Sequence, residues 1–269
     1  MILIEDQPKD PVVTKYVDRY QLFIINEPAY FKTIPNGKIE CYFVEEGEFL
    51  RWDNEANSFV TSGLSGYLPA TNHASLIQIP TKLICLNVKL NLSILSLSSF
   101  DDFLKKWQKF PVSALVSTRE EGKLGSCIDL EKPKINVSIL DKVLASSLSK
   151  MRINKEAEKV VNLIESSISE KLNVSELANQ ANCSGKTFER MIRKQFNMSP
   201  KDLLQVLRFE NVSSDMKNKS DRRFVDSLAF GYYDQSHFIK ECRKFTGYPP
   251  KEFFSKLKLK TNDIIVGND

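Results

Sequence analysis

The amino-acid sequence predicts an α+β protein whose N-terminal half is β-rich and whose C-terminal half is all-α. The β-rich half is indicated by residues 82–90, where Ile84, Leu86, Val88 and Leu90 share one face of an alternating strand. The all-α half is indicated after residue 172, where two segments repeat apolar residues at helical spacing around a turn. Because 269 residues accommodate two domains, we expect domains at residues 1–150 and 151–269.

The N-terminal half contains further short strand-like segments, separated by Gly, Pro and Asn. They are residues 39–44, 49–52, 58–61 and 75–79. Several short strands with such turns are typical of a barrel or sandwich, and we expect a barrel-like domain. Aromatic residues on these strands could line a ligand pocket, although such residues usually belong to the core. The candidates are Tyr42, Phe43, Trp52 and Tyr67.

Two amphipathic helical patterns follow the strands. The first has its apolar stripe at residues 100–110, and the second at residues 137–151. Either these helices cover the open side of the barrel, or one of them mediates dimerisation. Between them, residues 111–135 contain Pro and Gly with mixed charge and predict a long loop. We expect the domain boundary within residues 146–155.

The first helix-turn-helix pattern spans residues 174–194. We expect Ser175 and Glu176 to open its first helix and Ser184 to be the N-cap of its second helix. Apolar residues of the second helix then form an inner face. They are Phe188, Met191, Ile192 and Phe196. The outer face is left basic, as contact with a DNA major groove requires.

The second pattern spans residues 224–244 and repeats the same arrangement. Gly231 lies where a tight turn must reverse the chain, and Asp234 is the expected N-cap. The inner residues are Phe224, Val225, Leu228 and Ala229 in the first helix, and Phe238, Cys242 and Phe245 in the second. We expect His237 to pack or cap within this unit rather than touch a base.

These residues resemble the AraC/XylS family of bacterial transcription regulators. The resemblance covers about residues 155–257 and is most specific in Gly231–Phe238, Phe245–Gly247 and Pro250–Phe253. It implies an all-α domain of seven helices, with two helix-turn-helix motifs joined by a long helix from Pro200 to about Met216. The connection departs from the family's usual pattern in the polar stretch 210–215 and the charged stretch 217–223, which predicts a less rigid link between the two motifs. Residues 34–43 and 62–66 more weakly resemble the family's sensor-like N-terminal domain.

The charge distribution agrees with a DNA-binding C-terminal half. Residues 1–150 hold 17 Lys and Arg against 18 Asp and Glu, whereas residues 151–269 hold 21 against 16. A basic excess neutralises phosphates. The five cysteines form no C-x-x-C pair, which predicts buried thiols, Cys183 and Cys242 among them, in a reducing compartment. Without a signal peptide or a run of about 18 apolar residues, we expect a cytoplasmic protein without a membrane span.

The predicted function is sequence-specific DNA-binding transcription regulation, with two adjacent major-groove segments recognised. The expected DNA-binding residues are Lys186, Thr187, Glu189, Arg190, Arg193, Gln235, Ser236, Ile239, Lys240 and Arg243. Beside double-stranded DNA, candidate partners are RNA polymerase, a second copy of the chain and a small-molecule effector in the N-terminal domain. An interaction protein with vestigial DNA binding is the alternative. An enzyme is disfavoured, since His73 and His237 are the only histidines and no nucleophile or phosphate-loop motif occurs; no metal or cofactor is expected.

Overall fold

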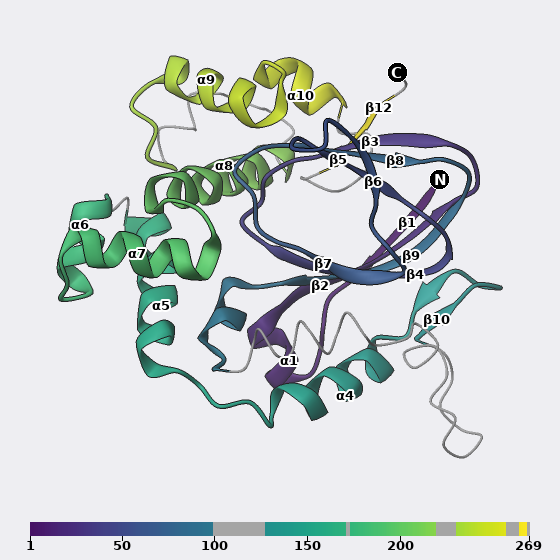
Figure 1. Cartoon of the computed structure of the whole chain (residues 1–269), viewed down its shortest axis with the longest axis horizontal. Coiled ribbons are helices and arrows are strands. Elements are labelled where there is room, and N and C mark those ends of the chain that lie inside the picture. Colours follow the sequence, from purple (N-terminus) through teal and green to yellow (C-terminus); the bar gives the residue numbers. More distant parts are fainter. Residues whose placement is uncertain (99–126, 171–172, 219–229, 257–263, 268–269) are drawn as a thin grey trace. The chain divides into compact units, whose positions relative to one another are not determined.

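The chain divides into two compact units (Figure 1). The computed structural model describes residues 1–98, 127–170, 173–218, 230–256 and 264–267. The first unit comprises Met1–Tyr30, Lys38–Pro69 and Ile77–Glu158. The second comprises Phe31–Gly37, Ala70–Leu76 and Lys159–Asp269. No helix within the described ranges is long and apolar enough to cross a membrane.

A five-stranded sheet with the order β1-β2-β9-β4-β7 forms the centre of the first unit. Its strands are β1 (Ile2–Asp6), β2 (Val17–Ile25), β9 (Leu83–Leu90), β4 (Ile39–Gly47) and β7 (Ser65–Leu68). Each pair of neighbouring strands in this sheet is antiparallel, and Leu86 lies opposite both Leu22 of β2 and Phe43 of β4. The strands expected at residues 39–44 and 82–90 are thereby confirmed, whereas β1 and β2 were not predicted individually.

A second five-stranded sheet has the order β12-β3-β8-β5-β6. Its strands are β12 (Ile264–Gly267), β3 (Ala29–Thr33), β8 (Ser75–Ile79), β5 (Leu50–Asp53) and β6 (Ser58–Thr61). The turn between β5 and β6 is fixed by Asp53, whose carboxylate accepts hydrogen bonds from the backbone N–H groups of Glu55 and Ala56. Two sheets of short strands confirm the predicted barrel-like β domain, including the strands expected at 49–52, 58–61 and 75–79.

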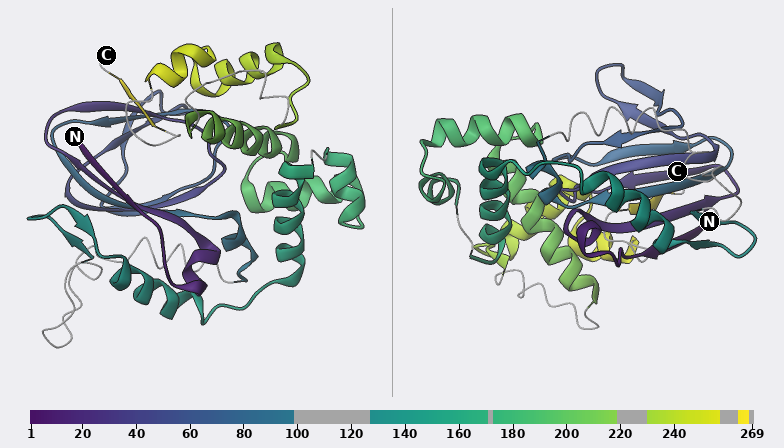
Figure 2. Two further views of the ribbon diagram at one scale, coloured as in Figure 1. Left: turned by 180° about the vertical axis from the view of Figure 1, so that it is seen from behind. Right: turned by 90° about the horizontal axis from the view of Figure 1, so that it is seen from below.

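The main core of the first unit lies between one face of the first sheet and its helices (Figure 2). The helices are α1 (Pro11–Tyr16), η1 (Leu92–Ser96) and α4 (Val137–Leu148). Leu86, Val88 and Leu90 are buried there, as the alternation predicted. Leu144 and Leu148 of α4 are only 2% and 3% exposed, so this apolar stripe covers the sheet of its own chain.

Asp141 ties α4 to the rest of the first unit. Its carboxylate accepts a 2.6 Å hydrogen bond from the buried hydroxyl of Tyr20 and bonds from the backbone N–H groups of Lys9 and Asp10. Asp10 in turn is the N-cap of α1. One buried carboxylate therefore joins a strand, a helix and the segment that begins α1.

Residues 111–135 were predicted to be a loop, which is wrong for its last part. Strands β10 (Ile128–Asp129) and β11 (Lys134–Ile135) form a hairpin, whose turn is held by Asp129 accepting from the N–H groups of Glu131 and Lys132. Buried Ile128 and Ile135 place this hairpin on the core. The expected stripe at residues 100–110 and the first part of the loop lie outside the described residues.

Six described helices lie wholly in the second unit or, for the first of them, mostly in it. They are α5 (Lys155–Glu170), α6 (Val174–Gln180), α7 (Gly185–Phe196), α8 (Pro200–Asn218), α9 (Gln235–Thr246) and α10 (Pro250–Lys256). The expected connecting helix is confirmed as α8, which continues through the polar stretch 210–215 without a break. The inner residues expected between Phe224 and Ala229 lie outside the described residues.

Candidate nucleic-acid interface

Helix α7 is the second helix of the first helix-turn-helix. Ser184 is its N-cap, as predicted, because its hydroxyl accepts a 3.2 Å hydrogen bond from the backbone N–H of Thr187. Asn197 ends the helix in the left-handed conformation, with φ 53°. The preceding helix α6 begins differently from the prediction: Asn173, not Ser175, is its N-cap. Asn173 and Glu176 form a reciprocal capping box, which satisfies N–H groups at the start of α6.

The two faces of α7 differ as expected. Phe188, Ile192 and Phe196 are buried, whereas Met191 is only partly buried. The outer residues Lys186, Glu189, Arg190 and Arg193 are exposed, and Thr187 is half-buried and hydrogen-bonded to the N-cap hydroxyl. The face that could meet DNA is therefore mostly basic, with one carboxylate in its centre.

That carboxylate has a partner on the same face. The Nε of Arg193 lies 2.9 Å from Oε1 of Glu189, one helical turn away, and both side chains are about half exposed. An ion pair exposed to this degree contributes only about 0.2–1 kcal/mol. Glu189 thus holds the Arg193 guanidinium without strongly stabilising the helix, and a phosphate could replace it as the partner.

Helix α9 occupies the same place in the second helix-turn-helix. Gly231 has φ 85°, in agreement with the predicted turn, and Asp234 is the N-cap through a 2.7 Å hydrogen bond from the backbone N–H of His237. Phe238, Cys242 and Phe245 are fully buried, as predicted. Gln235, Ser236, Lys240 and Arg243 are exposed and Ile239 is half-buried. The residues expected to bind DNA therefore fall on one face of each helix.

A buried polar cluster, which the sequence did not reveal, supports the start of α9. Glu241 is 4% exposed, and its carboxylate lies 3.3 Å from Nε2 of His237. The rings of Tyr232 and His237 meet edge to face at 5.0 Å, and the guanidinium of Arg208 lies over the Tyr232 ring. Burial, and then the charge of Glu241, raise the pKa of Tyr232. His237 therefore packs within the motif, in agreement with the expectation.

Helix α8 fixes α9 through an aromatic core. The ring of Phe209 on α8 lies 6.3 Å from Phe238, 5.2 Å from Phe245 and 5.9 Å from Phe253 of α10. At the surface, Nζ of Lys244 lies 2.9 Å from Oε1 of Gln205, again between α9 and α8. The second recognition helix is thus packed on the connecting helix. This packing, and the unbroken helix through residues 210–215, favour a rigid connection there; they say nothing of residues 219–223.

The cysteines follow their predicted burial with one exception. Cys41, Cys85, Cys127 and Cys242 are buried and all five thiols are free. Burial raises the pKa of Cys242 to about 12. Cys183 was expected to be inner but is only partly buried, because it lies in the turn directly before the N-cap of α7.

The aromatic residues considered for a pocket do not share one environment. Phe43 is 1% exposed and belongs to the core under the helices, so the pocket assignment is wrong for this residue. Tyr42 points to the opposite face of the same strand and contacts the Phe49 ring at 4.9 Å. Trp52 packs on Phe59 of the second sheet at 5.2 Å, and Tyr67 is 36% exposed.

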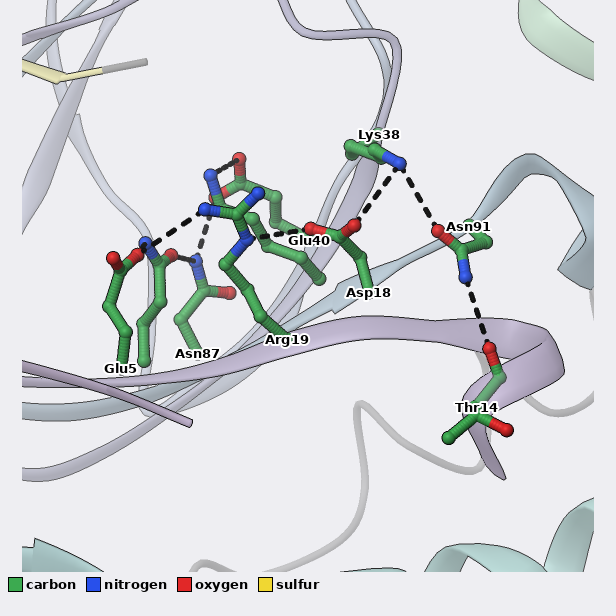
Figure 3. Close-up of polar contacts among 10 residues, drawn as sticks. Glu5, Thr14, Asp18, Arg19, Lys38, Glu40, Asn87 and Asn91 are labelled. Carbon is green, nitrogen blue, oxygen red and sulfur yellow. Dashed lines mark hydrogen bonds and ion pairs between the residues drawn. The ribbon is translucent and has the colours of Figure 1, made fainter. Parts of the chain in front are cut away.

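The face of the first sheet that points away from its helices carries a polar network (Figure 3). It draws side chains from four neighbouring strands, and Gln21, Asn87 and Lys89 are its buried centre. Asn87 donates to Glu40 at 2.8 Å and to Gln21 at 3.3 Å. Lys89 pairs with Glu40 at 3.3 Å.

The network continues toward the edge of the sheet through Glu5 and Arg19. Gln21 donates to Glu5 at 2.6 Å, and Arg19 pairs with Glu5 at 3.6 Å. Burial alone would raise the pKa of Asp18, but the charges of Lys38 and Arg19 outweigh it and lower that pKa. Oδ1 of Asn87 has no hydrogen-bond partner among the described residues, so this buried face retains an open acceptor.

Comparison with known proteins agrees with this geometry. Residues 177–256 match the family model described as a helix-turn-helix domain. No curated protein sequence matches the chain. Among solved structures, ToxT from Vibrio cholerae matches with 12% identity and a TM-score of 0.52, over 89% of this chain and 99% of that one. ToxT of strain SCE256 bound to an unsaturated fatty acid matches with 11% identity and a TM-score of 0.50, over 89% and 95%.

The ToxT likeness establishes the fold alone, a β-sheet domain followed by a helical domain. The matched family model covers both of the capped helices whose outer faces are basic. This match identifies residues 177–256 as a helix-turn-helix domain, the kind of domain whose second helix enters a DNA major groove.

Proposed function

We propose that α7 and α9 bind two successive major-groove segments through their outer faces. The observation that carries this proposal is the repeated arrangement of a capped helix, a buried aromatic inner face and an exposed polar and basic outer face. The residues proposed to contact DNA are Lys186, Thr187, Glu189, Arg190, Arg193, Gln235, Ser236, Ile239, Lys240 and Arg243. Recognition helices dock in this way in helix-turn-helix proteins.

Within α7 we assign Arg190 to base recognition and Arg193 to a phosphate. Replacing Arg190 by Ala should weaken binding to the selected site by about 5- to 150-fold, the equivalent of about 1–3 kcal/mol, and relax preference at one base. Replacing Arg193 by Ala should weaken binding to all sequences and flatten the salt dependence by about one unit. Equal losses for Arg190→Ala on selected and random DNA would contradict its assignment.

The two segments should lie about 10 base pairs apart, one turn of DNA. The packing of α9 on α8 through Phe209 supports a fixed spacing, although residues 219–223 lie outside the described part of the chain. Hydroxyl-radical footprinting of the full-length protein tests this. A single short protected segment, insensitive to scrambling of its neighbour, would mean that α9 does not recognise bases.

We further propose that residues 1–150 are a sensor or oligomerisation domain and residues 151–269 the DNA-binding domain. The near-neutral first part, the basic second part and the two compact units support this division. If the protein forms a homodimer, Leu144 and Leu148 do not supply the contact, since they are buried within their own unit. Sedimentation of the wild-type protein at micromolar concentration tests self-association. A monomer would rule out dimerisation in this concentration range.

An effector bound by the N-terminal half is the remaining element of the proposal. ToxT has been crystallised with an unsaturated fatty acid, and buried Lys89 in the polar network of this chain carries the charge that a carboxylate head group requires. Thermal unfolding of the full-length protein with and without an unsaturated fatty acid tests this ligand class; an unchanged melting temperature and unchanged DNA affinity would exclude it.

The free thiols support action in the reducing cytoplasm, where RNA polymerase is a candidate partner.

A further inference from the structure

Tyr233 is the large apolar or aromatic side chain with the greatest exposure among the described residues, at 91%. It lies in the turn of the second helix-turn-helix, directly before Asp234, the N-cap of α9. A single exposed aromatic residue needs no functional explanation by itself. Tyr233 differs from other exposed aromatic residues in its position before a recognition helix and in its stacking on a neighbouring ring.

The ring is held in place by the buried cluster beneath it. It stacks on the imidazole of His237, with centroids 5.7 Å apart and an interplanar angle of 21°. His237 is itself held by the ring of Tyr232 and the carboxylate of Glu241. Tyr233 therefore presents a preoriented flat apolar surface, so little conformational entropy would be lost when this surface meets a ligand.

The first helix-turn-helix has no equivalent surface. The residue directly before its N-cap Ser184 is Cys183, which is small and partly buried. The two halves share their caps and their aromatic inner faces, so this position is a difference between otherwise similar motifs. It predicts that α9 has an apolar contact that α7 lacks.

We propose that Tyr233 is a specificity-determining residue that packs against the C5-methyl group of a thymine in the segment bound by α9. The N-terminal end of a recognition helix is the part that meets base edges in the major groove. Among the groups exposed there, the thymine methyl is the apolar one, and aromatic side chains are suitable partners for it. This inference rests on the proposed function, because it requires α9 to lie in the major groove.

The test removes the methyl group and the ring separately. A binding site is first selected from random DNA by the full-length wild-type protein, and each thymine of its second segment is then replaced singly by deoxyuridine. Wild type should lose about fourfold in affinity at one position, as expected for one buried methyl group. Tyr233→Ala should bind the parent site more weakly and be insensitive to deoxyuridine at that position. Tyr233→Phe keeps the ring and should behave like wild type.

Two controls separate this contact from a loss of structure. Tyr233→Ala should melt like wild type, because the side chain is exposed. Tyr30→Ala removes another exposed tyrosine, from β3, and should leave the deoxyuridine profile unchanged.

Three results would overturn the inference. In the first, no replacement of a thymine by deoxyuridine lowers the affinity of the wild-type protein. In the second, Tyr233→Ala loses affinity at the same deoxyuridine position as wild type. In the third, Tyr233→Ala binds all DNA equally more weakly, and the same thymine methyl still contributes to its affinity. A failure of the proposed function looks different, since the wild-type protein would then select no site with two segments at all.

Discussion

Replacing Glu189 by Gln tests how the first recognition helix divides its contacts between protein and DNA. The substitution removes the negative charge that pairs with Arg193 at 2.9 Å, on the face proposed to meet phosphates, and leaves a neutral amide oxygen as a weaker acceptor. The pair is about half exposed on both sides, so the helix should lose little stability. The main effect should therefore appear in DNA binding, where Arg193 no longer exchanges Glu189 for its phosphate and no carboxylate opposes the phosphates.

The size of the effect follows from counterion release. Removing a carboxylate from the face that meets phosphates should act like one further phosphate neutralised, which steepens the dependence of log affinity on log salt by about 0.9. A fourfold increase in salt, from about 50 to about 200 mM, should then weaken Glu189→Gln about 3.5-fold more than wild type. Random-sequence DNA is the appropriate probe, since phosphate contacts carry no sequence information. Fluorescence anisotropy titrations at several salt concentrations measure the slope directly.

A matched control is available on α10. Glu252 forms the same kind of exposed pair with Lys256, one helical turn away at 3.7 Å, but α10 is not among the helices proposed to bind bases. Glu252→Gln makes the same change in net charge and should leave the slope nearer to wild type. If both variants steepen the slope equally, the effect is one of net charge alone. If neither variant steepens the slope, Glu189 does not oppose phosphate binding at this face, and the reasoning fails.

Three further outcomes are expected. Asp141→Ala should lower the free energy of unfolding by about 1–3 kcal/mol in urea titrations, because it leaves the buried Tyr20 hydroxyl without its acceptor; a loss below about 1 kcal/mol would contradict this role. A hydrogen bond from the Ser199 hydroxyl lowers the pKa of Asp202 below its ordinary value of 3.8, so the ionised carboxylate stabilises the fold above pH 3.8 and this stability is lost as the pH falls through the lowered pKa. Ser199→Ala should therefore make the loss of stability between about pH 5 and 2 shallower, and an unchanged pH dependence would refute the link between Ser199 and Asp202. Ellman's reagent should label Cys183 first in the native protein, with DNA slowing the reaction, and preferential labelling of another cysteine would contradict its assigned exposure.

Much of the DNA-binding half could be predicted because its signals are local. Ser184 and Asp234 cap helices through bonds to residues three positions away, and Gly231 adopts the positive φ that its place in the turn requires. Such contacts depend on nearby residues only. Local signals gave the wrong start for α6. Ser175 and Asn173 are both residue types that cap helices, and only the reciprocal hydrogen bonds between Asn173 and Glu176 show which of them is the N-cap.

The features that the sequence did not reveal depend on distant residues. Glu241 is a charged residue on a surface helix, and nothing nearby in sequence indicates that it is buried beside Tyr232, over whose ring Arg208 lies. The hairpin formed by β10 and β11 was missed because each strand has only two residues, too few for alternation to be visible. The polar network likewise brings together residues from β1, β2, β4 and β9.

That network also has a consequence for how the first sheet finds its correct pairing. Along β9, Leu86 and Val88 face the core while Asn87 and Lys89 face the network. A shift of β9 by one residue would turn Lys89 into the hydrophobic core and leave Glu40 without its cation. Misaligned sheets would therefore carry a buried unpaired charge, a penalty that an apolar strand would not impose. Lys89→Met should accordingly make folding less selective even where it leaves the final structure intact, with misfolded or aggregated species accumulating during refolding.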